Sequence, residues 1–470
     1  MNTPPKAAAQ NPSRIAARIY RGACMFTLLF AFAHVVSLPV EITYDGLGYI
    51  DMAGVLGSSR FPQDWNSTRT PLYPLALKIG FWFLGRQPLA PIVVSSGLAA
   101  LGILALGSAI RKIAGSGIAA AAMVVASLFP FLITYEHAVL TEAGSFFFLA
   151  MIFRLALISP ATAGDAWRRA AFLCLAFTAG YYWRQNILSI APAVALLLGF
   201  EEWTRLKQGA NWQILGRMAV IALLPYALTW PWARYIDAAG LRDVTLHQGM
   251  IRQALLPPED PYVGENAAMY EKAITDSMRN GNFYSGVTWD RLSAVMGPIF
   301  AKPVPQGTPR FFLDLIRRYP ARYARGFGRT VLLFAGVKGV ESDNRAYRGE
   351  VLSLTLNGSK IGDGPQPLQS RIKSEFEQRT TPSVIMRLLR DLSPLYDAAL
   401  PLASVMTALG LLAAVWFRDR GLLVFCGLPV VYMLGYAVLL VAIDRFMIPI
   451  YPMTLSNLFL VPASVWKRVR

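Results

Sequence analysis

The chain has 470 residues, of which 54% are hydrophobic and 16% are charged, and it carries a net charge of +17. Soluble domains are usually about 45–50% apolar and about 25% charged, so this composition excludes an ordinary soluble globular domain and favours an all-α polytopic membrane protein. We find no basic-aromatic nucleic-acid module. The excess positive charge is therefore assigned to loops that meet anionic membrane lipids or phosphate-bearing substrates, and nucleic acid is excluded as a partner.

The first 21 residues are polar and basic, and an apolar run follows from about residue 22 to residue 40. This run lacks the small-residue cleavage pattern of a secretory signal. We therefore predict a cytoplasmic tail over 1–21, followed by an uncleaved first membrane span.

A membrane span needs about 20 apolar residues, and about ten runs approach that length. The predicted spans are residues 22–40, 90–110, 117–135, 141–159, 169–183, 186–200, 215–233, 396–416, 421–442 and 446–464. The short basic loops between them all fall on the side of the N-terminus, which the positive-inside rule assigns to the cytoplasm. We therefore expect a bundle of about 10 helices (~10–12) with both termini cytoplasmic, in which 22–233 is one transmembrane module and 394–470 forms the last helices.

Two longer segments are then predicted to lie outside the membrane. In the first outer loop, 41–89, the stretches 43–56 and 69–85 read as helices lying along the membrane surface. The second segment, 234–393, is polar and rich in Gly and Pro, and we expect a large outer loop of mixed structure. Within it, 331–337 is too short to span and is expected to form an interfacial or re-entrant helix, whereas 357–367 reads as a turn-rich stretch.

The cysteines and the charged residues suggest different roles. Cys24, Cys174 and Cys426 all fall in apolar runs without metal-ligand spacing, so we interpret them as buried small hydrophobic residues. The outward-facing ends of the predicted spans instead gather charged and polar side chains on one membrane face. These are Asp45, Glu136, His137, Glu142, Arg184, Arg234, Asp444 and Arg445.

Each of these residues also has an ordinary structural explanation. Asp45 and Glu142 could cap helices, and Arg184 and Arg445 could be snorkelling anchors. Asp51 reads as a polar-face residue of the scaffold. Glu136 and His137 together with Glu142 resemble a loose metal set, so contacts to a metal or to an acceptor stay open and Mg²⁺ or Mn²⁺ is the candidate ion.

The shared side of these residues suggests a chemistry. Arginines bind phosphate through planar, bidentate hydrogen bonds, and a nearby carboxylate can accept the proton of an attacking hydroxyl. Apolar grooves between spans suit a polyprenyl tail. The pattern therefore predicts transfer of a sugar from a lipid-phosphate donor, with inversion at the anomeric carbon as a hypothesis.

In five pieces the chain resembles the GT-C class of membrane glycosyltransferases, and most closely the branch of protein O-mannosyltransferases and aminoarabinose transferases. The pieces, in chain order, are "YDGLGYIDMA", "TRTPLYPLALKIGFWFLG", "AVLTEAGSFFF", "WRQNILSIAPAVALLL" and "DRFMIPIYPMTLSNLFL". They cover roughly 1–235 and 395–470, which is most of the membrane part.

The resemblance implies a role for particular positions. Asp45 matches the catalytic aspartate of the family and Glu142 its second-loop acid, while Arg69, Arg184 and Arg445 match residues that meet the lipid phosphate. Arg234, at the outer end of its span, joins the expected phosphate-side set. The chain departs from the family pattern where Gly46 replaces a second acid, which weighs against a protein-mannosyltransferase identity.

The sequence leaves the acceptor open between a glycan, a lipid and a protein, and it leaves other functions open as well. A polysaccharide ligase or polymerase using an undecaprenyl-diphosphate glycan would also need arginines on the outer face. A non-enzymatic lipid or saccharide transporter would instead place charges near the middle of the membrane. The expected location is the bacterial inner membrane, with the active site facing the periplasm.

Overall fold

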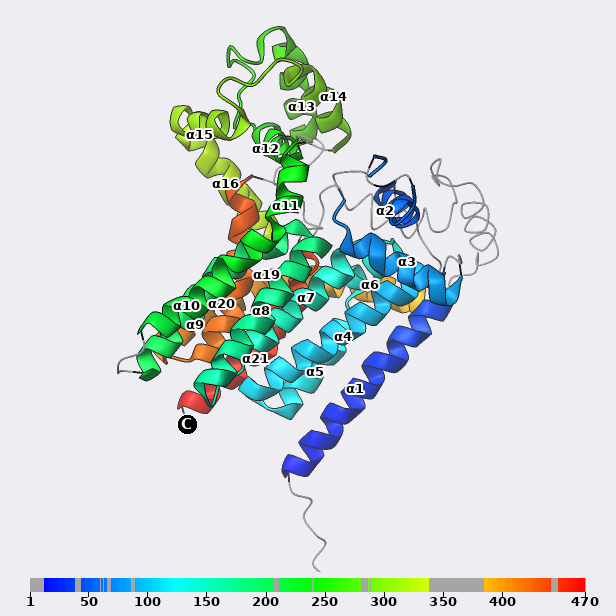
Figure 1. Ribbon diagram of the computed structural model, residues 1–470, viewed down its shortest axis with the longest axis vertical. Coiled ribbons are helices and arrows are strands. Elements are labelled where there is room, and N and C mark those ends of the chain that lie inside the picture. The colour runs from blue at the N-terminus through cyan, green and yellow to red at the C-terminus, as the bar shows by residue number, and fades with distance from the viewer. Residues whose placement is uncertain are drawn as a thin grey trace, which may run out of the picture.

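The computed structural model describes residues 12–38, 44–59, 61, 63–65, 69–85, 89–206, 211–238, 241–279, 286–287, 289–337, 384–440 and 447–469. All regular secondary structure in these residues is helical (Figure 1). The expectation of an all-α chain is therefore confirmed for this part of the sequence.

Most helices form one elongated bundle. Its members are α1 (Pro12–Ser37), α4 (Leu89–Ala114), α5 (Ser116–Ser127), α6 (Pro130–His137), α7 (Glu142–Ala156), α8 (Ala163–Trp183), η1 (Gln185–Ile190), α9 (Ala191–Leu206), α10 (Asn211–Ala222), α11 (Leu224–Ala238), α19 (Val384–Trp416), α20 (Arg420–Val438) and α21 (Tyr451–Val469). The start of α1 and the end of α21 lie at the same end of the bundle, which we call the terminal end (Figure 1). The opposite end, which carries the remaining helices, is called the loop end.

Several of these helices are long and apolar enough to cross a membrane. Five of the described helices meet that test, namely Arg14–Ser37, Leu89–Ala114, Trp212–Tyr235, Arg387–Trp416 and Arg420–Val438. Helices α5 and α6 together form a further candidate that is bent by 49°. These helices are consistent with a multi-pass helical membrane protein. The other predicted spans fall on α7, α8, η1 with α9, and α21, so the count of ten stays a prediction.

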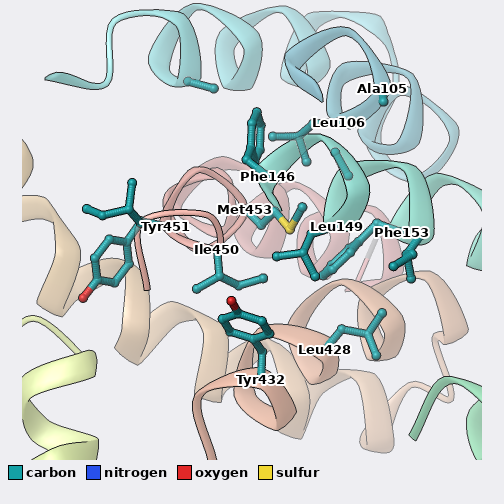
Figure 2. Packing of buried hydrophobic residues seen from close by; sticks show 14 of the residues in the cluster. Ala105, Leu106, Phe146, Leu149, Phe153, Leu428, Tyr432, Ile450, Tyr451 and Met453 are labelled. Atoms are coloured by element: carbon teal, nitrogen blue, oxygen red, sulfur yellow. The ribbon is translucent and has the colours of Figure 1, made fainter. Parts of the chain in front are cut away.

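The core of the bundle joins segments that lie far apart in the sequence. Figure 2 shows Leu106 of α4 and Leu149 of α7 in the same cluster as Leu428 of α20 and Met453 of α21. All four side chains are at most 2% exposed. This cluster therefore joins the N-terminal and C-terminal halves of the chain. Truncating one buried leucine to alanine typically costs about 2–5 kcal/mol of stability.

At the terminal end, three helices are tied by buried charges. Glu202 of α9 pairs with Arg169 of α8 at 2.7 Å and with Arg217 of α10 at 2.6 Å. All three residues are buried. Arg169 is the first residue of the predicted span 169–183, and it lies inside the protein because α8 begins earlier, at Ala163.

The loop end carries helices outside the bundle (Figure 1). The two helices expected in the first outer loop are present as α2 (Tyr44–Val55) and α3 (Leu72–Leu84). The second loop contributes α12 (Leu241–Arg252), η2 (Gly264–Asn266), α13 (Ala267–Arg279), α14 (Trp289–Ile299), α15 (Thr308–Arg318) and α16 (Pro320–Phe334). The expectation of mixed structure is thus wrong for the described part of this loop, which forms a helical unit with its own apolar core.

Several predicted boundaries fall inside helices. The helix α1 begins at Pro12 within the expected tail, and α11 and α19 extend past the expected edges of the second loop. Residues 331–337 are the last turn of α16 and the turn after it, and Leu333 and Phe334 are buried in the core of the bundle. This segment is therefore the end of an amphipathic helix and not a separate short one. The stretch 357–367 lies outside the described residues.

The helical unit is seated on the bundle by a very close backbone approach. A β-carbon at Gly249 of α12 would lie 2.0 Å from the carbonyl oxygen of Leu439, which follows α20. No side chain fits there, so glycine is required. Tyr323 of α16 also donates a hydrogen bond to the carbonyl of Val438. The outer unit is thus fixed to the loop end of α20.

Candidate functional site

The first outer loop packs directly on the turn between α6 and α7. A β-carbon at Gly46 of α2 would lie 3.0 Å from the carbonyl oxygen of Ala138 and 3.2 Å from that of Val139. A larger residue would push α2 away from this turn, which gives a packing reason for glycine where the resembling family often has an acid. Asp45 precedes Gly46 in the first turn of α2, but its side chain lies outside what the structure describes.

The turn itself is strained. Val139 has a φ of 53°, in the left-handed region that β-branched residues rarely adopt. Such a conformation costs of order 1–3 kcal/mol and persists only where the surroundings hold it in place. Here Val139 is fully buried, and it lies three residues before Glu142, the first residue of α7. The strain lies where the first outer loop meets the start of α7.

Arg69 lies beside α2. Its guanidinium carbon lies 4.5 Å from the centroid of the Tyr49 ring, which is a cation–π arrangement. Two side-chain hydrogen bonds also hold the chain segment of Arg69 in place. The Trp65 indole donates to the carbonyl of Arg69 at 3.1 Å, and the Thr70 hydroxyl donates to the carbonyl of Trp183 at 2.7 Å. Arg69 is therefore held close to the end of α8.

Glu142 and Arg184 form an ion pair at the loop end. Glu142 is the first residue of α7, and its Oε1 lies 2.9 Å from the Nη1 of Arg184. The carboxylate therefore lies at the positive end of the helix dipole. Arg184 has an extended backbone between α8 and η1, so its side chain leaves the helix where the span ends. The two residues that sequence patterns place in separate loops are thus brought together.

One oxygen of this carboxylate has no hydrogen-bond partner in the part of the chain that the structure describes. The Oε2 of Glu142 is buried and accepts no hydrogen bond within the described residues, although the side chain is only 2% exposed. Buried acceptors are nearly always satisfied, and an exception calls for an explanation such as strain, a bound water or ion, or a role in catalysis. The carboxylate is positioned to accept a hydrogen bond or a proton from a bound hydroxyl group.

A polar group on η1 and α20 extends this site, and the sequence did not reveal it. The Asn186 amide donates hydrogen bonds to the hydroxyl groups of Tyr432 and Tyr436, which lie one turn apart on α20. Both phenols lie close enough to Arg184 and Glu142 to interact with their charges. The spacing of two tyrosines by four residues in an otherwise apolar span is a signal that could have found them.

Glu136 and His137 belong to a separate polar chain with His34, another residue that the sequence did not single out. The His34 Nδ1 lies 3.0 Å from the Nε2 of His137, and its Nε2 lies 3.3 Å from the carboxylate of Glu136. All three side chains are buried, so this chain ties α1 to α6. In the described residues, no group of at least three His, Cys, Asp or Glu side chains has an arrangement that could hold a metal ion.

Arg234 and Arg445 complete the set of arginines that the sequence predicts for this end of the bundle. The exposed Arg234 of α11 lies over the ring of Trp230, 4.8 Å from its centroid, and Glu142 pairs with Arg184 instead. Asp444 and Arg445 lie outside the described residues. Met447, two positions after Arg445, lines an apolar cavity of about 40 Å³ with Phe334, Met433 and Tyr451.

Comparison with known proteins adds no relative. No protein-family model matches the chain, and no curated protein matches it.

Proposed function

We propose that the protein is a membrane glycosyltransferase of the GT-C type, which moves a sugar from a polyprenyl-phosphate donor to an acceptor on the outer face of a bacterial inner membrane. The single observation that carries the proposal is the convergence of Arg69, Glu142 and Arg184 at one end of the bundle. Those three residues come from three segments whose patterns resemble that class. The proposal includes ten membrane spans and an active site that faces the periplasm.

The roles follow from the chemistry of the transfer. The bond between the anomeric carbon and the phosphate oxygen breaks, and a bond from that carbon to the acceptor oxygen forms. The acceptor proton goes to a carboxylate, for which Asp45 is the first candidate and the unpartnered oxygen of Glu142 the second. The polyprenyl phosphate leaves with the bonding electrons, and Arg69 and Arg184 offset the charge that grows on it. Arg445 and Arg234 remain further candidates for that phosphate.

An apolar cavity near the loop end could contact a small part of the donor tail. This cavity, beside Met447, lies among α16, α19, α20 and α21 and has a volume of about 40 Å³, which is too small to enclose an isoprenoid chain. The donor phosphate would stay near the arginines at the helix ends. The cavity follows directly on the segment of Asp444 and Arg445, where the resemblance implies phosphate binding.

The test is sugar transfer by the purified full chain in lipid nanodiscs. Undecaprenyl-phosphate monosaccharides serve as donors and a bacterial envelope extract as acceptor, and released undecaprenyl phosphate is measured by mass spectrometry. We expect release with at least one donor. Asp45→Asn should reduce it by roughly 100-fold or more, because a general base contributes about 10²–10⁴-fold. Arg184→Ala should weaken donor use by roughly 10–100-fold, the equivalent of about 1.5–3 kcal/mol for a lost charged hydrogen bond.

Matched controls are available on the outer unit. Arg310→Ala and Glu271→Gln change the same residue types at exposed positions of α15 and α13, and release should not change. Absence of release with every donor would contradict the proposal. Release that is equal in the wild type and in Asp45→Asn would remove the aspartate from its catalytic role.

A further inference from the structure

A group of aromatic side chains lies next to Arg69 and has no role in the transfer chemistry described above. We call it the aromatic wall, and it consists of Phe61, Trp65, Tyr182, Trp232 and Tyr235. The Trp65 ring packs edge-on against Phe61 at 5.7 Å and against Trp232 at 5.8 Å between ring centroids. Tyr182 and Tyr235 pack on Trp232 at 6.5 Å and 5.3 Å. The wall joins the first outer loop to α8 and α11.

Polar groups tie the wall to the candidate site. The indole of Trp65 donates to the carbonyl of Arg69, and the hydroxyl of Tyr235 donates to the carbonyl of Trp65 at 3.4 Å. The backbone of Arg69 therefore contacts the wall directly, while its guanidinium lies over Tyr49. A ligand whose phosphate lies at Arg69 would place its adjacent chemical group near these rings.

One member of the wall carries an unused hydrogen-bond donor. The Nε1 of Trp232 is buried and has no hydrogen-bond partner among the described residues. The indole N–H groups of Trp65 and Trp183 each donate to a backbone carbonyl. A buried indole usually finds a partner, so the N–H of Trp232 indicates an acceptor that the protein does not supply.

The wall is only partly covered by protein. Phe61 is 40% exposed and Tyr235 is 37% exposed, whereas Trp65 is only 5% exposed. Aromatic residues at a membrane surface often anchor the protein among lipid head groups. The neighbouring Trp230, which is 58% exposed, fits that simple role. Trp65 and the buried N–H of Trp232 do not, because an anchor presents its N–H to water or to head groups.

From these contacts we infer that the aromatic wall binds a sugar ring. A pyranose has an apolar C–H face, which can stack on aromatic rings, and hydroxyl oxygens, which can accept the indole N–H of Trp232. A lipid tail offers the apolar contact but no acceptor. The inference rests on the proposed function and adds to it the place where the saccharide lies, beside the phosphate site at Arg69.

The test measures binding without turnover. The full chain in nanodiscs is mixed with methyl α-D-mannopyranoside, methyl α-D-glucopyranoside or methyl β-L-arabinopyranoside, and saturation-transfer NMR reports which sugar protons contact the protein. We expect transfer to the ring C–H protons of at least one pyranoside. Trp232→Phe should weaken that signal and Trp232→Ala should reduce it by roughly tenfold, because stacking and the hydrogen bond are then both lost.

Trp212→Phe is the matched control, because Trp212 is 70% exposed at the start of α10 and far from the wall in the fold. Its signal should equal that of the wild type, and Trp232→Phe should keep the wild-type thermal unfolding midpoint. Absence of transfer to all three pyranosides, or equal signals in the wild type and in Trp232→Ala, would overturn the inference. Release of undecaprenyl phosphate together with unchanged pyranoside binding in Trp232→Ala would refute only the role of the aromatic wall in sugar binding. Pyranoside binding without any release of undecaprenyl phosphate would refute only the proposed function.

Discussion

The two ends of the bundle each hold a buried glutamate paired with arginine, but the two carboxylates are satisfied to different degrees. At the terminal end, Glu202 has both oxygens engaged, Oε1 by Arg169 and Oε2 by Arg217. At the loop end, Glu142 has Oε1 beside Arg184, while Oε2 is buried without a hydrogen-bond partner in the described residues. The carboxylate of Glu202 is thus satisfied by the protein, although the Nη1 of Arg217 is buried without a partner in the described residues, whereas the carboxylate of Glu142 keeps an oxygen that can accept a further hydrogen bond.

This difference separates a structural pair from a functional candidate. A buried charge is expensive unless it is paired and hydrogen-bonded, so an incomplete shell persists only where another requirement maintains it. The strained Val139 lies on the same side as the incomplete pair, three residues before Glu142. The unsatisfied oxygen and this strained residue therefore lie close together at the loop end, where the sequence predicts the chemistry.

The largest expected effect concerns the complete pair. Glu202→Ala leaves two buried guanidinium groups without their shared carboxylate, and we expect a loss of about 3–5 kcal/mol in the free energy of unfolding. Chemical denaturation of the detergent-solubilised chain measures this loss. Glu202→Gln keeps the shape and should retain part of the stability. A loss below that of Glu142→Gln would reverse the comparison between the two ends.

At the incomplete pair we expect a smaller change in stability and a larger change in activity. Arg184 is 13% exposed and keeps access to solvent, so Glu142→Gln should cost about 1–3 kcal/mol in the free energy of unfolding. Release of undecaprenyl phosphate should nevertheless fall by roughly tenfold or more, because the amide lacks the negative charge with which the Glu142 carboxylate would accept a proton. The same denaturation and release assays measure both quantities. Wild-type release in Glu142→Gln would show that its buried oxygen has no part in the reaction.

Much of the helical framework could be predicted because apolar runs and turn residues act locally. The first-loop helices α2 and α3 appear where the sequence placed them, and the described helices follow the predicted runs along the chain. The predicted ends were less accurate, because helices such as α1 and α19 continue past the apolar stretch into polar segments. Hydropathy reports the membrane-compatible part of a helix and not its full length.

The sequence could predict which charged residues lie at the outer ends of the spans, but it could not predict how their hydrogen bonds are satisfied. The approach of Glu142 to Arg184 followed from placing both at outer helix ends, but the unused oxygen depends on packing that no local pattern encodes. His34 and Asn186 were missed for the same reason, since each acquires its partner from a distant helix. The buried pairing of Arg169 could not be predicted either, because charge alone does not distinguish a solvated arginine from a paired one.

The smallest expected effect comes from an exposed ion pair, which extends the comparison to a site that water reaches. Asp276 of α13 accepts hydrogen bonds from Lys272 and from Arg291 of α14, and these bonds hold the pKa of its carboxyl below the ordinary value of 3.8. A lowered pKa means that this contribution to stability is present above the ordinary value and is lost as the pH falls through the value in the folded protein.

Hydrogen exchange of α13 and α14 in the full chain, measured near pH 5 and at strongly acidic pH, tests this contact. The wild type should lose protection at the acidic pH, whereas Asp276→Asn should show the lower protection already near pH 5. Glu271→Gln, an exposed carboxylate on the same helix, should behave as the wild type. Ion pairs that water reaches contribute little to stability, so the change should be confined to these helices and leave the loop-end site intact. Equal protection of Asp276→Asn and the wild type near pH 5 would show that this pair adds no stability where water competes for its hydrogen bonds. The stability that ion pairs give to the bundle would then depend on their burial.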